Sequence, residues 1–407
     1  MNLKIMAIVM AGGEGSRLNP LTAMRSKPAV PFAGRYRIVD FVLSNLINSG
    51  INSIYLLVQY KSQSLIEHIS HSWVLAPGMA DHFVTVVPPQ MMEGKKWFQG
   101  TADAVIQNID LIERHAPQLV AVFGADHIYR MDVRQMVAFH RSRRAAVTVA
   151  ALPVPRGEAS AFGIIDADEE GRVRGFQEKP GEPAPMPANP HMAFSSMGNY
   201  LFDTGVLLDA LRETRARREN DFGRDVIPRL IDSHPVYAYN FADNRIPGTR
   251  PYEEPSYWRD VGTLDAYFSA SMDLLGKEPR LNLFNPRWPI GSSNYQGPVS
   301  RIVEGNLRNC LIGAGTLIKG GKVSNSILRR EVVVEEDVLI EDCVIMDYTV
   351  IRRGARLRRA IVDRYNVLET GASVGYDLEA DRQRYFVTDS GLVVIPKGHA
   401  SPEIERY

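Results

Sequence analysis

The feature that most restricts the fold of this sequence is a six-residue repeat in its last third. A second apolar track runs one residue behind the first, and Arg356 is the one interruption. The first track consists of Val332, Val338, Val344, Val350, Val362, Leu368 and Val374, and the second of Val333, Leu339, Ile345, Ile351 and Leu357. Hexads of this kind are typical of a left-handed parallel β-helix, in which each hexad forms one face of a triangular coil. We therefore expect the valines of the first track to fill the coil interior; a β-sandwich, the alternative, would alternate with a period of two.

The repeat also divides the chain. Ile312 and Ile318 are out of phase with it, which predicts a bulge or loop near Gly320-Gly321. A stretch rich in Pro and Asn between positions 282 and 298 separates the repeat from what precedes it. The chain has 407 residues, enough for two cores. We predict a first domain of residues 1–282 and a β-helix domain of residues 283–407.

The first domain alternates strands and helices. Buried strands are expected at 5–10, 54–58 and 120–123, with a helical face through Val39, Leu43 and Ile47 and a second helix capped by Thr101. This order predicts an α/β, Rossmann-like domain with a mostly parallel sheet and helices on both faces. Strand-like runs at 145–152, 163–166 and 173–177 lack intervening helices, so the later part of the sheet should be mixed.

Composition excludes several classes of protein. Lys plus Arg and Asp plus Glu both number 47, so no global field favours nucleic acid or an anionic membrane. The two cysteines, Cys310 and Cys343, cannot form a disulfide framework and suit a reducing compartment, which indicates a cytoplasmic location. The apolar run at 5–11 is short and leads into Gly12-Gly13, as expected for a buried strand rather than a signal peptide. No apolar run is long enough to span a bilayer.

A glycine-rich loop follows the first strand and reads Gly12-Gly13-Glu14-Gly15-Ser16-Arg17. Its backbone amides can approach phosphate oxygens. It is neither a dinucleotide fingerprint nor a Walker loop, because it lacks the third glycine of the former and the Gly-Lys-Ser/Thr of the latter. Arg17 and Lys27 would add positive charge for a triphosphate. The alternative is a tight turn with an exposed arginine.

Two aspartates are candidate metal ligands. Asp126 follows the buried strand at 120–123, and Asp260 precedes an apolar helix. Two carboxylates from distant segments can hold one Mg²⁺ ion. Spacing alone favours the alternative for Asp260, that of an acidic residue stabilised at a helix N-terminus.

Other patterns carry less weight. Lys179, before Pro180, can hold a monophosphate, although such a lysine is commonly part of a solvated turn. His68, His127 and His140 form no metal-ligand pattern. Asp221-Phe222-Gly223 matches a protein-kinase triplet but lacks the other kinase motifs, so we assign it no function.

Taken together, these pieces resemble bacterial glucose-1-phosphate adenylyltransferase over nearly the whole chain. The resemblance rests on the following segments: 12–18 (GGEGSRL), 27–32 (KPAVPF), 100–104 (GTADA), 126–129 (DHIY), 178–180 (EKP), 196–198 (SMG) and 257–263 (YWRDVGT). Their combination is specific, whereas each alone is weak. The resemblance implies that AMP is transferred from ATP to glucose 1-phosphate, with release of pyrophosphate, for glycogen or α-glucan synthesis.

The resemblance also assigns roles to residues. It implies that Arg17, Lys27 and Asp126 are catalytic, and that Asp126 and Asp260 bind Mg²⁺. It implies a nucleotide site made by Gly12, Gly13, Gly15, Gln59, Gly100 and Thr101. It implies a glucose 1-phosphate site made by Glu178, Lys179 and Ser196.

Regulation and assembly are further implications of the resemblance. The resemblance implies that the chain forms a homotetramer. It also implies that sugar-phosphate or nucleotide effectors control its activity. Met24 and Pro31 stand where some relatives carry a Lys and a His for anionic activators, and Phe98 stands where many have Tyr. Arg25, Arg37 and Arg358 remain as cations for an effector, with a solvated basic face as the alternative.

Three rival interpretations stay open at this point. One is a sugar-1-phosphate nucleotidyltransferase that uses UTP or dTTP. A second is a non-catalytic regulatory subunit, against which intact Asp126, Asp260 and Lys179 argue. A third is a β-helix acyltransferase, for which the coils offer no supported histidine base.

Overall fold

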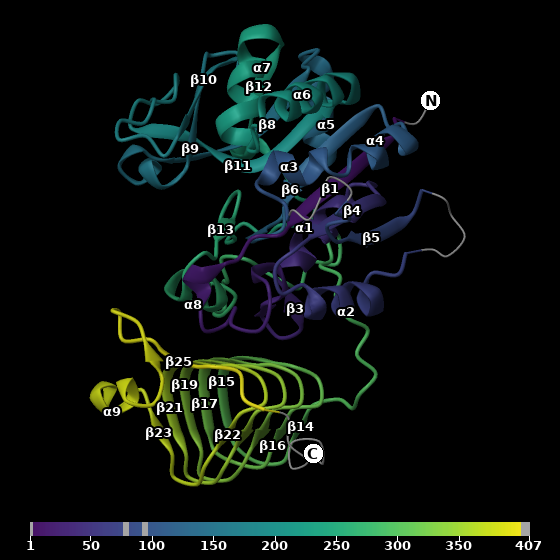
Figure 1. Cartoon of the computed structure of the whole chain (residues 1–407). Helices are drawn as coiled ribbons and strands as arrows, with labels where there is room; N and C mark the ends of the chain where they lie inside the picture. Colours follow the sequence, from purple (N-terminus) through teal and green to yellow (C-terminus); the bar gives the residue numbers. More distant parts are fainter. Residues whose placement is uncertain (1–2, 76–80, 92–96, 400–407) are drawn as a thin grey trace.

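The computed structural model describes residues 3–75, 81–91 and 97–399, and Figure 1 shows an α/β domain stacked on a coil of parallel strands. The apolar runs of the first domain form one sheet, ordered β10-β9-β11-β6-β1-β4-β5, with β8 joining β11 to β12. Its strands are β1 (Ile5–Ala11), β4 (Ser53–Val58), β5 (Phe83–Val87), β6 (Leu119–Gly124), β8 (Val147–Pro155), β9 (Gly163–Ala167), β10 (Val173–Glu178), β11 (Met192–Asp203) and β12 (Val236–Asn240). β1 pairs in parallel with β4 and β6, whereas β11 runs antiparallel to β6, β8 and β9. The predicted mixed sheet is confirmed.

Helices cover both faces of this sheet, because alternate residues of each strand are apolar on opposite sides. Met6, Ile8 and Val120 pack on one side beneath α3 and α6, while Ala7 and Val9 pack on the other beneath α1, α2 and α5. The helices are α1 (Val39–Asn48), α2 (Gln63–Ser72), α3 (Thr101–Ile106), α4 (Ile109–His115), α5 (Val133–Ser142), α6 (Thr204–Arg217), α7 (Ile227–Ser233) and α8 (Leu264–Met272).

One helix prediction was wrong in detail. The helix expected to begin at Thr101 is two helices, α3 and α4, and Thr101 does not cap the first. Its Oγ1 instead donates to Asp221 Oδ2 over 3.0 Å and accepts from Phe222 N–H over 3.0 Å. A tertiary contact has therefore taken the hydroxyl that local capping would have used.

Between α8 and β14 (Arg301–Ile302) the chain, described throughout, forms neither helix nor strand and runs beside α1. Gly291 N–H donates to Ser44 Oγ over 2.9 Å, and Ser292 Oγ donates to Asp40 Oδ2 over 2.6 Å. This segment thus ties the start of the β-helix to the first domain.

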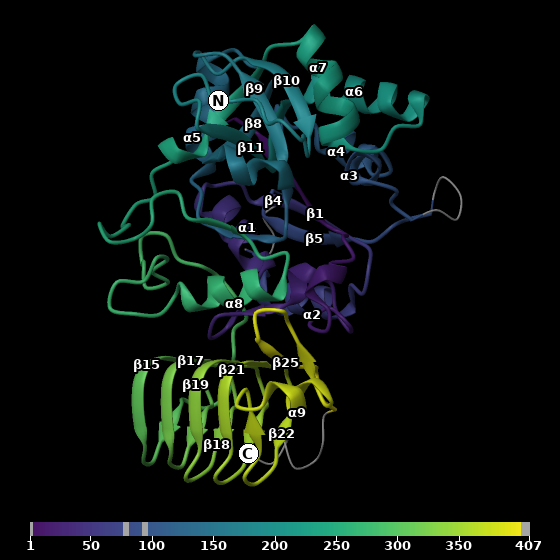
Figure 2. The same ribbon diagram turned by 90° about the vertical axis from the view of Figure 1, so that its left-hand side faces the viewer.

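The last part of the chain is a parallel β-helix, whose successive coils lie side by side in Figures 1 and 2. Its strands are β15 (Asn306–Ile312), β16 (Leu317–Ile318), β17 (Lys322–Leu328), β18 (Val333–Val334), β19 (Leu339–Ile345), β20 (Val350–Ile351), β21 (Arg356–Val362), β22 (Val367–Leu368), β23 (Ser373–Val374) and β25 (Val393–Ile395), besides β14. Leu339 pairs with Arg356, so one turn takes 17 residues, one fewer than three hexads. Leu317 pairs with Val333, a turn of 16, because the corner at Gly320-Gly321 is one residue shorter than the next one. The phase change predicted there is therefore a short corner rather than a bulge.

This shorter turn corrects the predicted interior. One set of residues that point inward recurs at intervals of six, five and six: Val334, Ile340, Ile345, Ile351, Leu357, Val362, Leu368 and Val374. A strict six-residue track cannot follow them, so it crosses to the outside and back. Val332, Val338, Val362, Leu368 and Val374 do face the interior as predicted, but Val344 and Val350 do not.

Val344 lies in the core between the two domains. Ile327, Val344, Ile361 and Val394 stand in register on successive strands. They pack against apolar residues of the first domain that include Leu18, Phe32, Phe41, Tyr267 and Phe268. The β-helix is thus fixed to the first domain through a buried apolar ladder, near the loops that follow β1.

The two ends of the β-helix differ. Helix α9 (Leu378–Arg382) and the hairpin of β24 (Phe386–Val387) with β25 cover its last coil, because Leu378, Tyr385 and Val387 pack on its core. Its first coil instead exposes Val299, Ile302 and Val303. In the described residues, no helix combines the length and apolar character needed to cross a membrane.

Candidate functional site

The candidate site lies where adjacent parallel strands of the first domain end. β6, β1 and β4 are neighbours, so the loops after them meet at one edge of the sheet. These loops carry Asp126, the glycine loop and Gln59. They surround a cavity of about 630 Å³ lined by Gly12, Gly13, Gly15, Arg17, Lys27, Gln59, Phe98, Gly100, Thr101, Asp126 and His127, among others. The structure therefore brings together the residues expected to bind a nucleotide.

Gly15 shapes the glycine loop. Its φ is 65°, in the left-handed region, and a Cβ there would lie 2.9 Å from Lys27 Cβ. A larger residue would force the loop away from Lys27. The chain then enters the short 3₁₀ helix of Ser16–Leu18, which places Arg17 on the cavity wall.

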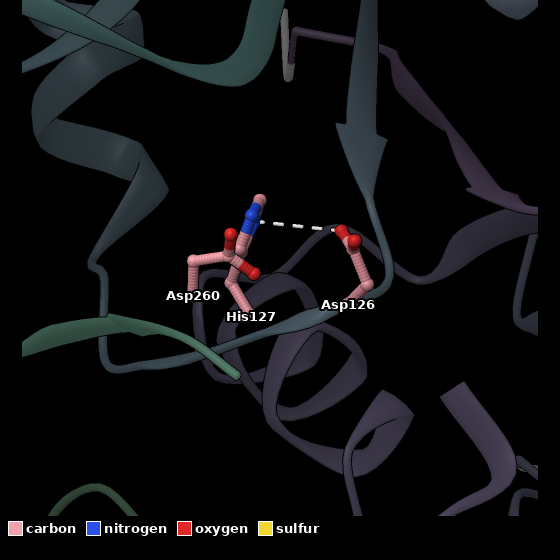
Figure 3. Close-up of side chains that lie close together, drawn as sticks. All are labelled: Asp126, His127 and Asp260. Carbon is pink, nitrogen blue, oxygen red and sulfur yellow. Dashed lines mark ion pairs between the residues drawn. The ribbon is translucent and has the colours of Figure 1, made fainter. Parts of the chain in front are cut away.

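A short ribbon positions the second aspartate. β7 (His127–Tyr129) pairs antiparallel with β13 (Trp258–Asp260), and the register sets Asp260 opposite His127. Ligand atoms of Asp126, His127 and Asp260 all lie within 4.8 Å of one another (Figure 3). Asp260 is therefore positioned by strand pairing with a residue 133 positions earlier, His127, rather than by the helix that follows it.

Lys27 lies between the two carboxylates. Its Nζ donates to Asp126 Oδ2 over 3.0 Å and to Asp260 Oδ1 over 2.9 Å. Burial alone would lower the pKa of Lys27, but the two carboxylates raise it above its usual value. Burial would raise the pKa of Asp126, but His127 and Lys27 outweigh it and hold that pKa at about 2. Lys27 and Asp126 are thus both charged at neutral pH.

His127 is closer to this cluster than the sequence indicated. Its Nδ1 lies 3.6 Å from Asp126 Oδ1, the pair marked in Figure 3, and its ring packs 4.7 Å from that of Trp258. The other two histidines are structural, as expected. His68 Nε2 contacts Asp40, and His140 Nδ1 contacts Thr148 Oγ1, both inside the domain.

The expected nucleotide contacts from outside the glycine loop also line the cavity. The Gln59 side chain exchanges hydrogen bonds with the backbone of Phe98, whose N–H donates to Gln59 Oε1 over 2.5 Å. A Cβ on Gly100 would meet Asn220 O at 2.3 Å, so only glycine allows this close approach. These contacts fix the cavity wall on the side away from the aspartates.

A second cavity of about 210 Å³ adjoins the first, and Met10, Thr101 and Gly198 line both. It contains two residues expected at the sugar-phosphate site, Glu178 and Ser196, together with Tyr200 and Asp221. Lys179 stands outside its lining: its side chain is 66% exposed, with Nζ 3.7 Å from Glu178.

Asp221 is a residue that the sequence does not identify, because its Asp-Phe-Gly triplet matches a kinase motif and no other part of that motif set is present. Its carboxylate accepts from Thr101 Oγ1 and from Arg224 N–H. Asp221 precedes the helical turn of residues 222–226, and Thr101 Oγ1 hydrogen-bonds both Asp221 and Phe222. Only this tertiary contact reveals that Asp221 lines the second cavity.

A third cavity, of about 300 Å³, lies between the domains. We call it the arginine pocket, and its lining includes Arg35, Arg37, Arg329, Arg330 and Asp347. Burial and neighbouring arginines lower the pKa of Arg37. Of the residues expected to bind an effector, Arg37 lies in this pocket and Arg25 lies close to it, paired with buried Asp363. Arg358 is not part of the lining, because it lies over the ring of Tyr376.

Comparisons with known proteins agree with this geometry. Residues 6–277 match the nucleotidyl transferase family model, and residues 299–395 match the GlmU-like C-terminal hexapeptide model. The chain is 55% identical to the glucose-1-phosphate adenylyltransferase of Thermodesulfovibrio yellowstonii, over 97% of this chain and 96% of that one. It is 48% identical to that of Thermus thermophilus, over 98% and 99% of the two chains. It is 46% identical to that of Corynebacterium jeikeium, over 97% and 98%.

Proposed function

This chain belongs to the glucose-1-phosphate adenylyltransferase family of nucleotidyltransferases, and from that premise we propose that it makes ADP-glucose and pyrophosphate from ATP and glucose 1-phosphate. The product would serve glycogen or α-glucan synthesis. The observation that carries the proposal is the pair of adjoining cavities. One is lined by the glycine loop and Asp126, with Asp260 close to Asp126, and the other by Glu178 and Ser196.

The reaction joins the two substrates where these cavities meet. A phosphate oxygen of glucose 1-phosphate attacks the α-phosphorus of ATP, and pyrophosphate leaves in line. The attacking oxygen is already anionic, so no general base is needed, and catalysis rests on positioning and charge neutralisation. We assign Arg17 and Lys27 to the triphosphate, because both line the cavity beside the glycine loop.

The nucleotide and sugar contacts follow from the same arrangement. Gly12, Gly13 and Gly15 present backbone amides, and Gln59, Gly100 and Thr101 form the opposite wall for the base and ribose. Glu178 and Ser196 would bind glucose hydroxyls, and exposed Lys179 would fold over the sugar phosphate.

Nucleotidyltransferases of this kind generally use a divalent metal ion, and the donors here fit one. Asp126 and Asp260 direct oxygens at one point, where they already surround the positive charge of Lys27. Oxygen donors suit Mg²⁺, so we propose that these two aspartates bind it, with the His127 ring beside Asp126. When bound, the ion would neutralise charge on the phosphate oxygens.

The choice of ATP over other nucleotides is tested by pyrophosphate release with ATP, UTP, dTTP and GTP, each with glucose 1-phosphate. The proposal expects ATP to be preferred by at least tenfold in kcat/KM. Faster turnover with UTP or dTTP would identify the rival nucleotidyltransferase. No turnover with any of them would indicate the non-catalytic subunit.

Regulation and assembly complete the proposal. We assign catalysis to residues 1–282, and effector response and association to residues 283–407. Arg25 and Arg37 are candidates to bind an anionic effector, as is the more distant Arg358. The apolar first coil of the β-helix supports association into a homotetramer. The cytoplasmic location remains a prediction from the cysteines.

A further inference from the structure

The inference concerns Lys27, and it rests on the proposed metal-dependent function. The same two carboxylates that would hold a divalent ion already hold the Lys27 ammonium, at 3.0 and 2.9 Å. The lysine side chain is 9% exposed, whereas those of Asp126 and Asp260 are 41% and 29% exposed. A cation from solvent can therefore reach the carboxylates, but the ammonium lies on their buried side.

The backbone of Lys27 has little freedom to retreat. It begins the 3₁₀ turn of Lys27–Ala29, followed directly by Pro28, and its Cβ lies against Gly15. Two residues earlier, Arg25 is anchored to Asp363 of the β-helix. Any change in the position of the ammonium must come from rotation of the lysine side chain.

An ammonium and a divalent ion cannot both keep these contacts. Two carboxylates carry two negative charges, and three positive charges within about 4 Å would repel one another strongly at low effective dielectric. Lys27 also lines the cavity beside Gly13, Gly15 and Arg17, so its side chain has somewhere else to go.

We propose that Lys27 competes with the divalent cation for Asp126 and Asp260, and that losing this competition turns its ammonium toward the nucleotide phosphates. Lys27 thus neutralises the carboxylate pair in the free protein and the triphosphate in the loaded one. Arrival of the metal and formation of the lysine–phosphate contact are coupled events. The free protein consequently has a weaker metal site than two bare carboxylates would form.

The test measures Mn²⁺ binding in the absence of nucleotide and sugar. Binding is monitored through the electron paramagnetic resonance signal of the free ion. Lys27→Met removes the competing charge, and we expect it to tighten Mn²⁺ binding at least tenfold, the scale of a charge-assisted contact. The matched control is Lys61→Met, which removes a lysine whose Nζ donates to the backbone oxygens of Thr22 and Ala23 and which is not part of the cavity lining. It should change the affinity less than threefold.

Two further measurements keep the test independent of folding and of function. Lys27→Gln keeps a hydrogen-bond donor without the charge and should tighten Mn²⁺ binding as Lys27→Met does. It replaces Lys27→Met in the test if thermal denaturation shows that variant to be unstable. Unchanged or weaker Mn²⁺ binding in both Lys27 variants overturns the proposal, as does equal tightening in Lys61→Met. Wild-type turnover with ATP and glucose 1-phosphate is assayed separately, so failure of the proposed reaction is distinguished from failure of the competition.

Discussion

The aspartate pair around Lys27 and the arginine pocket between the domains bring together charges of opposite sign, although the whole chain is neutral. In the first, one buried lysine faces two carboxylates. In the second, the Asp347 carboxylate is shared by Arg329, Arg330 and Arg364, at 3.1, 3.6 and 3.3 Å. Local charge of either sign has therefore been built without a net charge that would attract unrelated polyions.

The surroundings of Asp347 in the arginine pocket differ in charge from those of Lys27. Burial would raise the pKa of Asp347, but Arg329, Arg364 and Arg330 hold it well below its usual range. Positive charge remains in excess there, whereas negative charge remains in excess around Lys27. The first cavity suits a cation, and the arginine pocket suits an anion. A single segment supplies a cation to both regions, since Lys27 reaches the aspartates while Arg25 pairs with Asp363 of the β-helix.

The largest expected effect separates the two regions physically. Val344→Asp would bury a carboxylate in the apolar layer between the domains, at a cost of several kcal/mol. We expect the β-helix to detach, with loss of assembly and of any effector response before basal catalysis, because the predicted substrate residues all precede Leu264.

Chemical denaturation, sedimentation and assays with and without sugar phosphates test this expectation. Val344→Ala is the control, since it loses packing without adding charge and should be milder. An unchanged oligomer with normal stability would show that this layer does not hold the domains together.

The next effect is confined to the carboxylate cavity. Asp126→Asn removes one of the two anions that face Lys27, and turnover should fall about a hundredfold or more, as for loss of a key electrostatic contact. Steady-state assays with matched circular dichroism measure it. Asp110→Asn, an exposed change on α4, should stay within about twofold of wild type. Turnover of Asp126→Asn within tenfold of wild type would refute the assignment.

A smaller effect is expected at the second cavity. Lys179→Ala should weaken the contact to the sugar phosphate by about 1.5–3 kcal/mol. The Michaelis constant for glucose 1-phosphate should therefore rise far more than that for ATP. Lys322→Ala, on the exposed β-helix surface, should change neither. Equal increases for both substrates would mean that Lys179 acts only through structure.

The smallest effect tests the charge of the arginine pocket. Arg37→Gln should weaken binding of inorganic phosphate to that pocket by about 1 kcal/mol, roughly fivefold, since other arginines remain. Calorimetry at low ionic strength measures it, and basal turnover should hold. Arg212→Gln, on the solvated face of α6, is the control. Undiminished phosphate binding in Arg37→Gln would show that the arginine pocket is not the anion-binding counterpart of the aspartate site.

Much of the architecture could be predicted from the sequence because it depends on local patterns. The strand at 5–10 leads into glycines, and the strands at 54–58 and 120–123 are short and apolar, so their parallel pairing and the meeting of their loops follow from α/β geometry. The residues of the glycine loop, together with Asp126, were found in this way. The six-residue repeat likewise indicates a β-helix.

Long-range packing decided the rest. Asp260 reaches Asp126 only because β13 pairs with β7, and Asp221 reaches the second cavity only through Thr101. The direction in which Val344 points depends on a 17-residue turn, whose missing residue is invisible to a six-residue count. The sequence determined which segments form strands and loops, because propensity and periodicity act over a few residues. The tertiary structure decided which charges face one another, because that depends on the register between segments that are far apart in the chain.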